Sequence, residues 1–297
     1  MTYKKQKALV GYLFLTPYML AFLCFLALPV IVAGTLSVMQ FDLTSKETTH
    51  FVGAQNFKEV YKDTYFWQAL LATSRYVIWM VPCMVFTALG IALGLNAMSK
   101  GRNITRALIF LPGMFTIAVT AIIWNWFYNL EFGFFNFVIK HFGGQPVPWL
   151  SEKSLAMPSI VLMALWWSAG GASIIILTSL QQIPKMYFEA ASLDGANIWQ
   201  LFRNITFPLL KPVLFFVILT STIGAFQMFP QASLLTNGGP ELSTRGVVQY
   251  IYETAFNNYR LGYAASISWI LAAITMIFGA FQFLMIRKGA RNASKSV

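Results

Sequence analysis

The segment from Gln181 to Lys211 contains the most informative arrangement of residue types in the chain. Pro184 can begin a helix, Asp194 and Gly195 mark a turn, and Pro208 can end a second short helix, so the segment predicts a helix–turn–helix. Its two short helices carry exposed apolar candidates, namely Tyr187, Phe188, Leu193, Ile198, Trp199 and Phe202. Such a surface fits either a protein interface or a helix resting on a bilayer, and composition alone favours neither.

Side chains that could hold a metal or carry out catalysis are scattered through the sequence. His50 and His141 stand alone in predicted loops, and Cys24 and Cys83 lie inside apolar runs. No nucleophile–base pair is evident, and all ten acids fall in loops or at the ends of apolar segments. We therefore expect no metal site, no cofactor and no enzymatic activity in this chain, which argues against a membrane-embedded enzyme.

The overall composition points to lipid as the solvent. Of the 297 residues 57% are hydrophobic and only 10% are charged, whereas soluble domains have roughly a quarter charged residues. The net charge of +11 comes from basic residues placed between apolar stretches, not from one patch, so nucleic-acid binding is not expected.

Apolar continuity predicts an all-α membrane protein with about six transmembrane helices in one domain, residues 1–297. The first apolar run is too long for a cleavable signal and should remain as a span. The expected spans cover about residues 9–38, 67–97, 105–130, 154–180, 209–232 and 263–286, and residues 181–211 form the longest inner loop.

Lysine and arginine set the expected orientation. The N-terminus, the loops near residues 100–106 and 181–211, and the C-terminus together carry 13 of the 21 cations but only two acids, Glu189 and Asp194. These segments therefore hold the whole net charge of +11. By the positive-inside rule this face is cytoplasmic, and both termini lie there, as an even number of spans requires.

The acids of the inner loop belong to a spaced pattern. Glu189, Ala190 and Ala191 are followed by Gly195 and then by Ile205-Thr206-Phe207-Pro208, which gives EAA-x3-G-x9-I-x-F-P. This resembles the EAA motif of permease subunits of binding-protein-dependent ABC importers, with Phe207 in place of leucine. The resemblance implies the type I ABC importer permease fold.

In that family the loop is a coupling helix that docks in a cleft of the ATPase subunit. The resemblance assigns this role to Glu189, Ala190, Ala191, Asp194, Gly195, Ile205 and Pro208. Small alanines allow close approach, and one glutamate can pair with a cation across an interface. The chain has no G-x4-G-K-[ST] phosphate loop, so ATP and magnesium are expected on a partner ATPase.

Further stretches place the chain in the sugar-permease branch. Residues 51–57 resemble its first outer loop, and residues 235–240 resemble the outer T-x-G-G-P element of the maltose/oligosaccharide-type first permease subunit. The resemblance implies a MalF-like member of a heterodimer that works with a second homologous permease, two ATP-binding subunits and an extracytoplasmic solute-binding protein.

Sugars are bound by planar polar groups and by aromatic faces. The offset from the EAA motif places Trp166, Trp167, Ser168 and Gly171 in the region that contacts sugar in the maltose-type permease, and it adds candidates from two other spans. These are Ser221, Gln227, Thr116, Thr120 and Asn125. For each of them an interfacial belt or a hydrogen bond within its own helix remains an alternative.

The resulting expectation is a permease subunit that imports a carbohydrate, a di- or oligosaccharide, across the cytoplasmic membrane of a bacterium or archaeon. The same machinery could instead carry a polyol or a glycerol phosphodiester. An ion-coupled secondary transporter is a further alternative, which the lack of intramembrane carboxylates disfavours.

Overall fold

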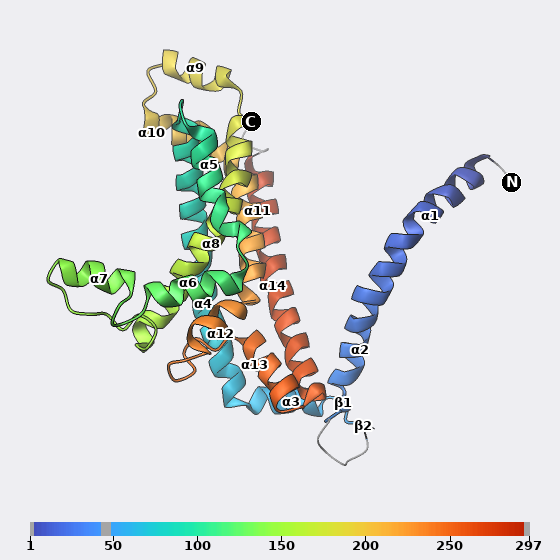
Figure 1. Ribbon diagram of the computed structural model, residues 1–297. Coiled ribbons are helices and arrows are strands. Elements are labelled where there is room, and N and C mark those ends of the chain that lie inside the picture. Colours follow the sequence, from blue (N-terminus) through green and yellow to red (C-terminus); the bar gives the residue numbers. More distant parts are fainter. Residues whose placement is uncertain (1–2, 43–48, 294–297) are drawn as a thin grey trace. The chain divides into compact units, whose positions relative to one another are not determined.

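The computed structural model describes residues 3–42 and 49–293 and divides the chain into two compact units. The first unit contains Met1–Phe66 and Ile251–Ala272, and the second contains Trp67–Tyr250 and Ala273–Val297. Helices make up almost all of the described regular structure (Figure 1).

The first unit joins a long apolar helical run to a small polar cap. The run is α1 (Tyr3–Phe22), η1 (Leu23–Ala27) and α2 (Leu28–Ser37); the cap is β1 (Met39–Gln40), β2 (His50–Phe51), α3 (Gln55–Lys62), η4 (Glu253–Asn257) and the start of α14 (Leu261–Ala293). β1 and β2 are antiparallel, with Met39 opposite Phe51. The Asn56 amide donates to the carbonyls of Ser37 (2.9 Å) and Met39 (3.0 Å) and so fixes the end of α2.

The second unit is a helical bundle. Its elements are α4 (Thr64–Ala97, which begins in the first unit), α5 (Arg102–Phe110), η2 (Leu111–Met114), α6 (Ile117–Phe127), α7 (Phe134–His141), α8 (Lys153–Gln181), α9 (Lys185–Leu193), α10 (Ile198–Leu201), η3 (Phe202–Thr206), α11 (Phe207–Phe226), α12 (Pro230–Thr236), α13 (Val247–Tyr252, whose last two residues belong to the first unit) and the end of α14. Ala88 and Ala92 lie one turn apart on α4 and are fully buried, which lets neighbouring helices approach closely. Ile176 of α8 and Val217 of α11 belong to the same apolar cluster.

Helices long and apolar enough to cross a membrane lie near the positions expected for the spans, with two differences. Five described helices are long and apolar enough to cross a membrane, or six if one bent pair counts as a span. That pair replaces the continuous helix expected over residues 105–130, because Arg102–Met114 and Ile117–Phe127 meet at 99°. The break itself lies at Phe115 and Thr116, which are extended, and Pro112 and Gly113 lie in the 3-10 turn η2 directly before it, where proline removes a backbone donor.

The fifth span also differs from its expected limits of 209–232. A run of helix extends from Ile198 to Phe226, so Pro208 does not end the second short helix of the inner loop. Pro208 lies in the first turn of α11, where its missing N–H is tolerated better than in a helix interior. At the other end the chain leaves the helix at Gln227 and enters α12 at Pro230.

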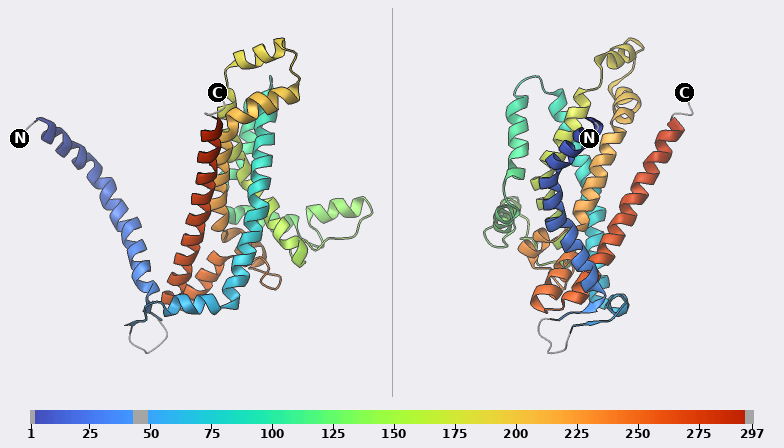
Figure 2. Two further views of the ribbon diagram at one scale, coloured as in Figure 1. Left: turned by 180° about the vertical axis from the view of Figure 1, so that it is seen from behind. Right: turned by 90° about the vertical axis from the view of Figure 1, so that its right-hand side faces the viewer.

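The loop that carries α7 is held together by one buried amide. Asn136 has no exposed surface, and its Nδ2 donates to the carbonyl of Val147 at 3.0 Å while its Oδ1 accepts from the N–H of Val147 at 2.8 Å. Longer bonds reach the carbonyls of Asn129 and Leu130. These bonds close a loop that projects from the side of the bundle (Figure 2).

Replacing Asn136 with alanine should open this loop and leave the bundle intact. The change leaves buried backbone groups unpaired, which costs about 1–3 kcal/mol, so trypsin should cleave after Lys140 about tenfold faster or more. Limited proteolysis in detergent measures this, with the exposed Asn257→Ala as control. Equal cleavage of the two variants would show that Asn136 does not hold the loop.

Candidate functional site

The loop of residues 181–211, called the coupling loop below after its predicted role, turns at a helix C-cap. Gly195 has φ +79°, the N–H of Ala196 donates to the carbonyl of Ala191 at 2.9 Å, and the N–H of Gly195 donates to the carbonyl of Ser192 at 3.1 Å. This is the Schellman pattern, which favours glycine at the left-handed position. Among the described residues, apart from the two chain neighbours of Gly195, no atom lies within 4 Å of a Cβ built on it, so its role inside the chain is conformational.

A capping box follows at once. The N–H of Gln200 donates to Asn197 Oδ1 at 2.9 Å, and the N–H of Asn197 donates to Gln200 Oε1 at 2.8 Å. Each side chain therefore satisfies a backbone group at the start of α10. The helix then passes through η3, which contains Ile205, into α11, which contains Pro208. Two caps thus fix the geometry of the loop and attach it to a long helix.

The coupling loop presents an uncovered apolar surface. Leu193 is 90% exposed, Ile198 86% and Trp199 65%, and Glu189 and Ala190 are exposed beside them. Figure 1 shows α9 and α10 at one end of the bundle, with α9 beyond the ends of the long helices of the second unit. The expectation of an exposed apolar patch is therefore met, and it lies on a rigid support.

An inner cavity of about 290 Å³ lies among α4, α8, α11 and α12. Three of the residues expected on the substrate path meet there: Trp167 and Ser168 from α8, and Ser221 from α11. The rest of the wall is a mixture of aromatic, sulfur-containing, small and polar side chains. It consists of Tyr76, Met80, Met84, Ala164, Ala172, Thr220, Gly224, Ala225 and Gln231.

The polar groups of this inner cavity differ in how they are satisfied. Ser168 and Thr220 donate their hydroxyl protons to their own helices, to Ala164 O at 2.6 Å and Phe216 O at 2.8 Å, and keep oxygen lone pairs for an acceptor role. Within the described residues, Gln231 Oε1 is buried without a donor and the Ser221 hydroxyl has no hydrogen-bond partner. The cavity therefore offers hydrogen-bond acceptors beside two aromatic side chains.

Gln231 was not among the residues expected from the sequence. It lies within residues 209–232, the expected fifth span, and a polar residue inside a span is itself a signal. Tyr76 and Thr220 were missed as well, because helical periodicity alone does not show which face of a buried helix lines a cavity.

The other expected path residues lie elsewhere. Trp166 is 40% exposed and lines a separate pocket beside Trp124, with ring centres 5.9 Å apart. Gly171 lines a pocket with Arg106, and Gln227 is exposed as the C-cap of α11.

The three polar candidates of α6 also lie outside the inner cavity. Thr116 caps α6 by accepting from the N–H of Val119, and Asn125 donates to the carbonyl of Leu234 at 3.1 Å, which ties α6 to α12. The Thr120 hydroxyl is buried with no partner among the described residues. Two of the three thus have structural contacts that account for a polar side chain.

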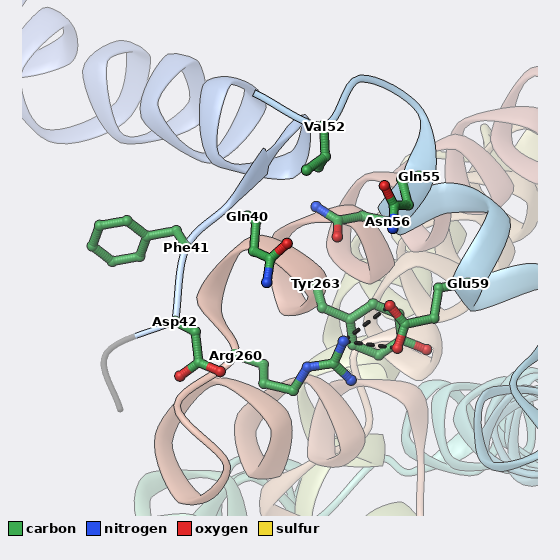
Figure 3. Close-up of a pocket in the computed structure, with 9 residues that line it drawn as sticks. All are labelled: Gln40, Phe41, Asp42, Val52, Gln55, Asn56, Glu59, Arg260 and Tyr263. Carbon is green, nitrogen blue, oxygen red and sulfur yellow. Dashed lines mark hydrogen bonds and ion pairs between the residues drawn. The ribbon is translucent and has the colours of Figure 1, made fainter. Parts of the chain in front are cut away.

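A polar pocket of about 160 Å³ occupies the cap of the first unit (Figure 3). Arg260 Nη2 donates to both carboxylate oxygens of Glu59, at 2.7 and 2.9 Å, and its guanidinium lies over the Tyr263 ring at 4.5 Å. The Tyr263 hydroxyl donates to Asp63 at 2.6 Å. These contacts connect α3 and the residue after it to the start of α14, so we assign them a structural role, which is to hold the cap together.

Lys153 and Glu241, which are far apart in the sequence, form an exposed ion pair. Lys153 lies 2.9 Å from Glu241, and this hydrogen bond, with its attraction, lowers the pKa of the Glu241 carboxyl. Glu241 directly follows residues 235–240, the T-x-G-G-P element. Across the described residues no group of three His, Cys, Asp or Glu side chains could hold a metal ion.

Comparison with known proteins agrees with this architecture. The Bacillus subtilis protein called probable ABC transporter permease protein YesP is 36% identical over 91% of this chain and 88% of its own length. The trehalose/maltose transport system permease protein MalF of Thermococcus litoralis is 34% identical over 87% of this chain and 86% of its own length. A solved structural neighbour is a chain in the crystal structure of a bacterial alginate ABC transporter in complex with an alginate pentasaccharide-bound periplasmic protein. The two chains superpose with a TM-score of 0.86 over 97% of each chain, at 22% sequence identity. This likeness shows the type I permease fold.

The model of one protein family matches residues 76–289, which include the coupling loop, the inner cavity and the bent pair. The chain spans the membrane several times and carries the fold of ABC transporter permease subunits. It belongs to the family described as the binding-protein-dependent transport system inner membrane component.

Proposed function

We propose that this chain is a permease subunit of an ATP-driven importer that moves a carbohydrate, a di- or oligosaccharide, into the cytoplasm. The observation that carries the proposal is the inner cavity, where aromatic side chains lie beside unsatisfied acceptors, in a chain 34% identical to a trehalose/maltose permease. Sugar hydroxyl groups can donate hydrogen bonds to the side-chain oxygens of Gln231 and Ser221. The chain supplies no catalysis and no cofactor of its own, and ATP and magnesium belong to the partner ATPase.

The proposed assembly contains a second homologous permease, two ATP-binding subunits and an extracytoplasmic solute-binding protein in a bacterial or archaeal cytoplasmic membrane. The exposed apolar patch of the coupling loop supports the ATPase contact, with Glu189, Ala190, Ala191, Asp194 and Gly195 at the interface. Ile205 and Pro208 join this surface to α11. The excess of cations on the same side supports a cytoplasmic position for the loop and for both termini.

ATP-driven closure of the two ATP-binding subunits would move the coupling loop. This movement would change the side of the membrane to which the inner cavity opens. α11 provides a direct route, because the helix that begins at Ile198 also contributes Thr220 and Ser221 to the cavity wall. Each ligand drives this cycle by its higher affinity for one of the two states.

The coupling loop can be tested with two matched glycines. Gly195→Asp should keep the second permease in a pull-down from native membranes and lose most of the ATPase, because it strains a left-handed position and adds a charge at the docking surface. Gly101→Asp is the control, because Gly101 has φ +74°, also faces open space within the chain, and lies in another cytoplasmic loop. Loss of the ATPase from both variants, or its absence from the wild-type sample, would contradict the proposed contact.

The inner cavity can be tested with two glutamines. Gln231→Met removes an acceptor that has no partner among the described residues, so folding should be unaffected while KM for sugar uptake rises about tenfold. Gln227 lies outside the cavity lining, so Gln227→Met should change KM by less than about twofold. Uptake of labelled trehalose, maltose and maltotriose with the matching binding protein measures both.

The same uptake assay tests whether the transported substrate is a compound other than a sugar. Labelled glycerol, sorbitol and glycerophosphocholine should not be taken up. Transport of one of these with none of the sugars would move the assignment to a polyol or glycerol phosphodiester. An equal change in KM for Gln227→Met and Gln231→Met would contradict the proposal that the sugar passes through the inner cavity.

A further inference from the structure

An apolar groove of about 570 Å³ runs along the outside of α4, α11 and α14 in the second unit. Its wall consists of Val85, Phe86, Leu89, Phe207, Lys211, Leu214, Phe215, Ile218, Gln282 and Met285. Phe86 is 76% exposed and Met285 60% exposed, so side chains at the edges of the groove are uncovered. All three helices are candidate membrane spans, so hydrocarbon is the medium that such a wall fits.

Lys211 is the one charged residue of this wall. It follows Phe207 by one turn, and its Nζ lies 5.8 Å from the centre of that ring. No ion pair of Lys211 exists within the residues that the structure describes, and its side chain is exposed. Lys211 lies in the second turn of α11 (Phe207–Phe226), near its loop end. A lysine so placed can direct its ammonium toward the headgroup region while its methylene groups cover apolar surface.

The positive charge of Lys211 limits which molecule can fill the groove. Residues 1–41 contain no Asp or Glu, so the first apolar run of this chain offers no carboxylate to Lys211. A helix of another subunit would match this charge only if it placed an acid beside Lys211, near the end of its own span, and acids are rare in membrane-spanning segments. A phospholipid supplies acyl chains for the groove and a phosphate at the level of the lysine, and a strongly basic inner face attracts anionic lipid.

We propose that this groove binds an anionic phospholipid of the cytoplasmic leaflet, with an acyl chain against α4, α11 and α14 and the phosphate paired with Lys211. The pairing lies at the junction between the coupling loop and α11, since Phe207 is also the last apolar residue of the EAA-like pattern. A bound lipid would therefore brace the helix that leads from the coupling loop into the bundle.

A second polar group marks the groove wall. The Gln282 amide donates to the Thr222 hydroxyl at 2.9 Å, and that hydroxyl donates to Ile218 O at 2.7 Å, so the bond fixes which way the amide points. Gln282 Oε1 is left buried without a donor among the described residues. Thr222 follows Lys211 by eleven residues, about 16 Å along α11, so Gln282 lies at the depth of the acyl chain and not of the headgroup. Phosphatidylglycerol carries its charge at the phosphate, the group proposed to pair with Lys211, so it is the probe of choice.

The test is native mass spectrometry of the delipidated full-length chain in detergent. The chain is titrated in parallel with dioleoyl phosphatidylglycerol and dioleoyl phosphatidylcholine. Wild type should bind the anionic lipid about fivefold more tightly, Lys211→Gln should lose this preference, and Lys211→Arg should keep it. Lys185→Gln, an exposed cytoplasmic lysine outside the groove, should behave as wild type.

The position of the acyl chain is tested separately. A phosphatidylglycerol with a diazirine in its acyl chain should crosslink to peptides from α4, α11 and α14, and Leu89→Trp should reduce that crosslinking by filling the groove. Equal binding of the two lipids, a loss of preference in Lys185→Gln as well, or crosslinks confined to other helices would overturn the proposal. So would a photoreactive residue at Phe86 that captures another polypeptide in native membranes instead of lipid.

Discussion

The bend between α5 and α6 is the constraint on which the second unit depends, because a broken helix exposes backbone groups that lipid cannot satisfy. α8 supplies the support. A Cβ on Gly170 would collide with the Ile109 carbonyl, so only glycine allows α8 to approach α5 this closely. Trp167 Nε1 donates to the carbonyl of Phe115 at 2.9 Å, directly at the bend. The same tryptophan lines the inner cavity, so the residue that stabilises the break also shapes the proposed path.

The two proposed contacts of the chain, with the ATPase and with cargo, have opposite physical requirements. The coupling loop must keep its shape while its apolar side chains stay uncovered, and the C-cap at Gly195 and the capping box at Asn197 provide that stiffness locally. The inner cavity must hold polar groups in a medium that penalises them, and it does so by letting Ser168 and Thr220 bond their own helices. Neither device needs a charged residue inside the membrane.

Much of this architecture could be predicted from the sequence because it follows from local rules. Hydropathy predicts the candidate spans, and the EAA-like spacing marks the loop of residues 181–211 as a candidate interface. The 99° bend was not predicted, because Pro112 and Gly113 are compatible with either a kink or packing until α8 is known to lie beside them. The inner cavity was predicted only in part, with Trp167, Ser168 and Ser221 found there. Gln231 reaches the cavity through the turn after Phe226, which no periodic pattern reveals.

The unbroken run from Ile198 to Phe226 makes α10, η3 and α11 a lever. At about 1.5 Å per residue, Ser221 lies about 35 Å from the start of that run. A tilt of about 5° at the loop end, transmitted without bending, would displace the cavity end by about 3 Å. That is the length of one hydrogen bond. A small rotation imposed at the membrane surface is therefore large enough to make or break every polar contact that Ser221 could offer to a cargo molecule.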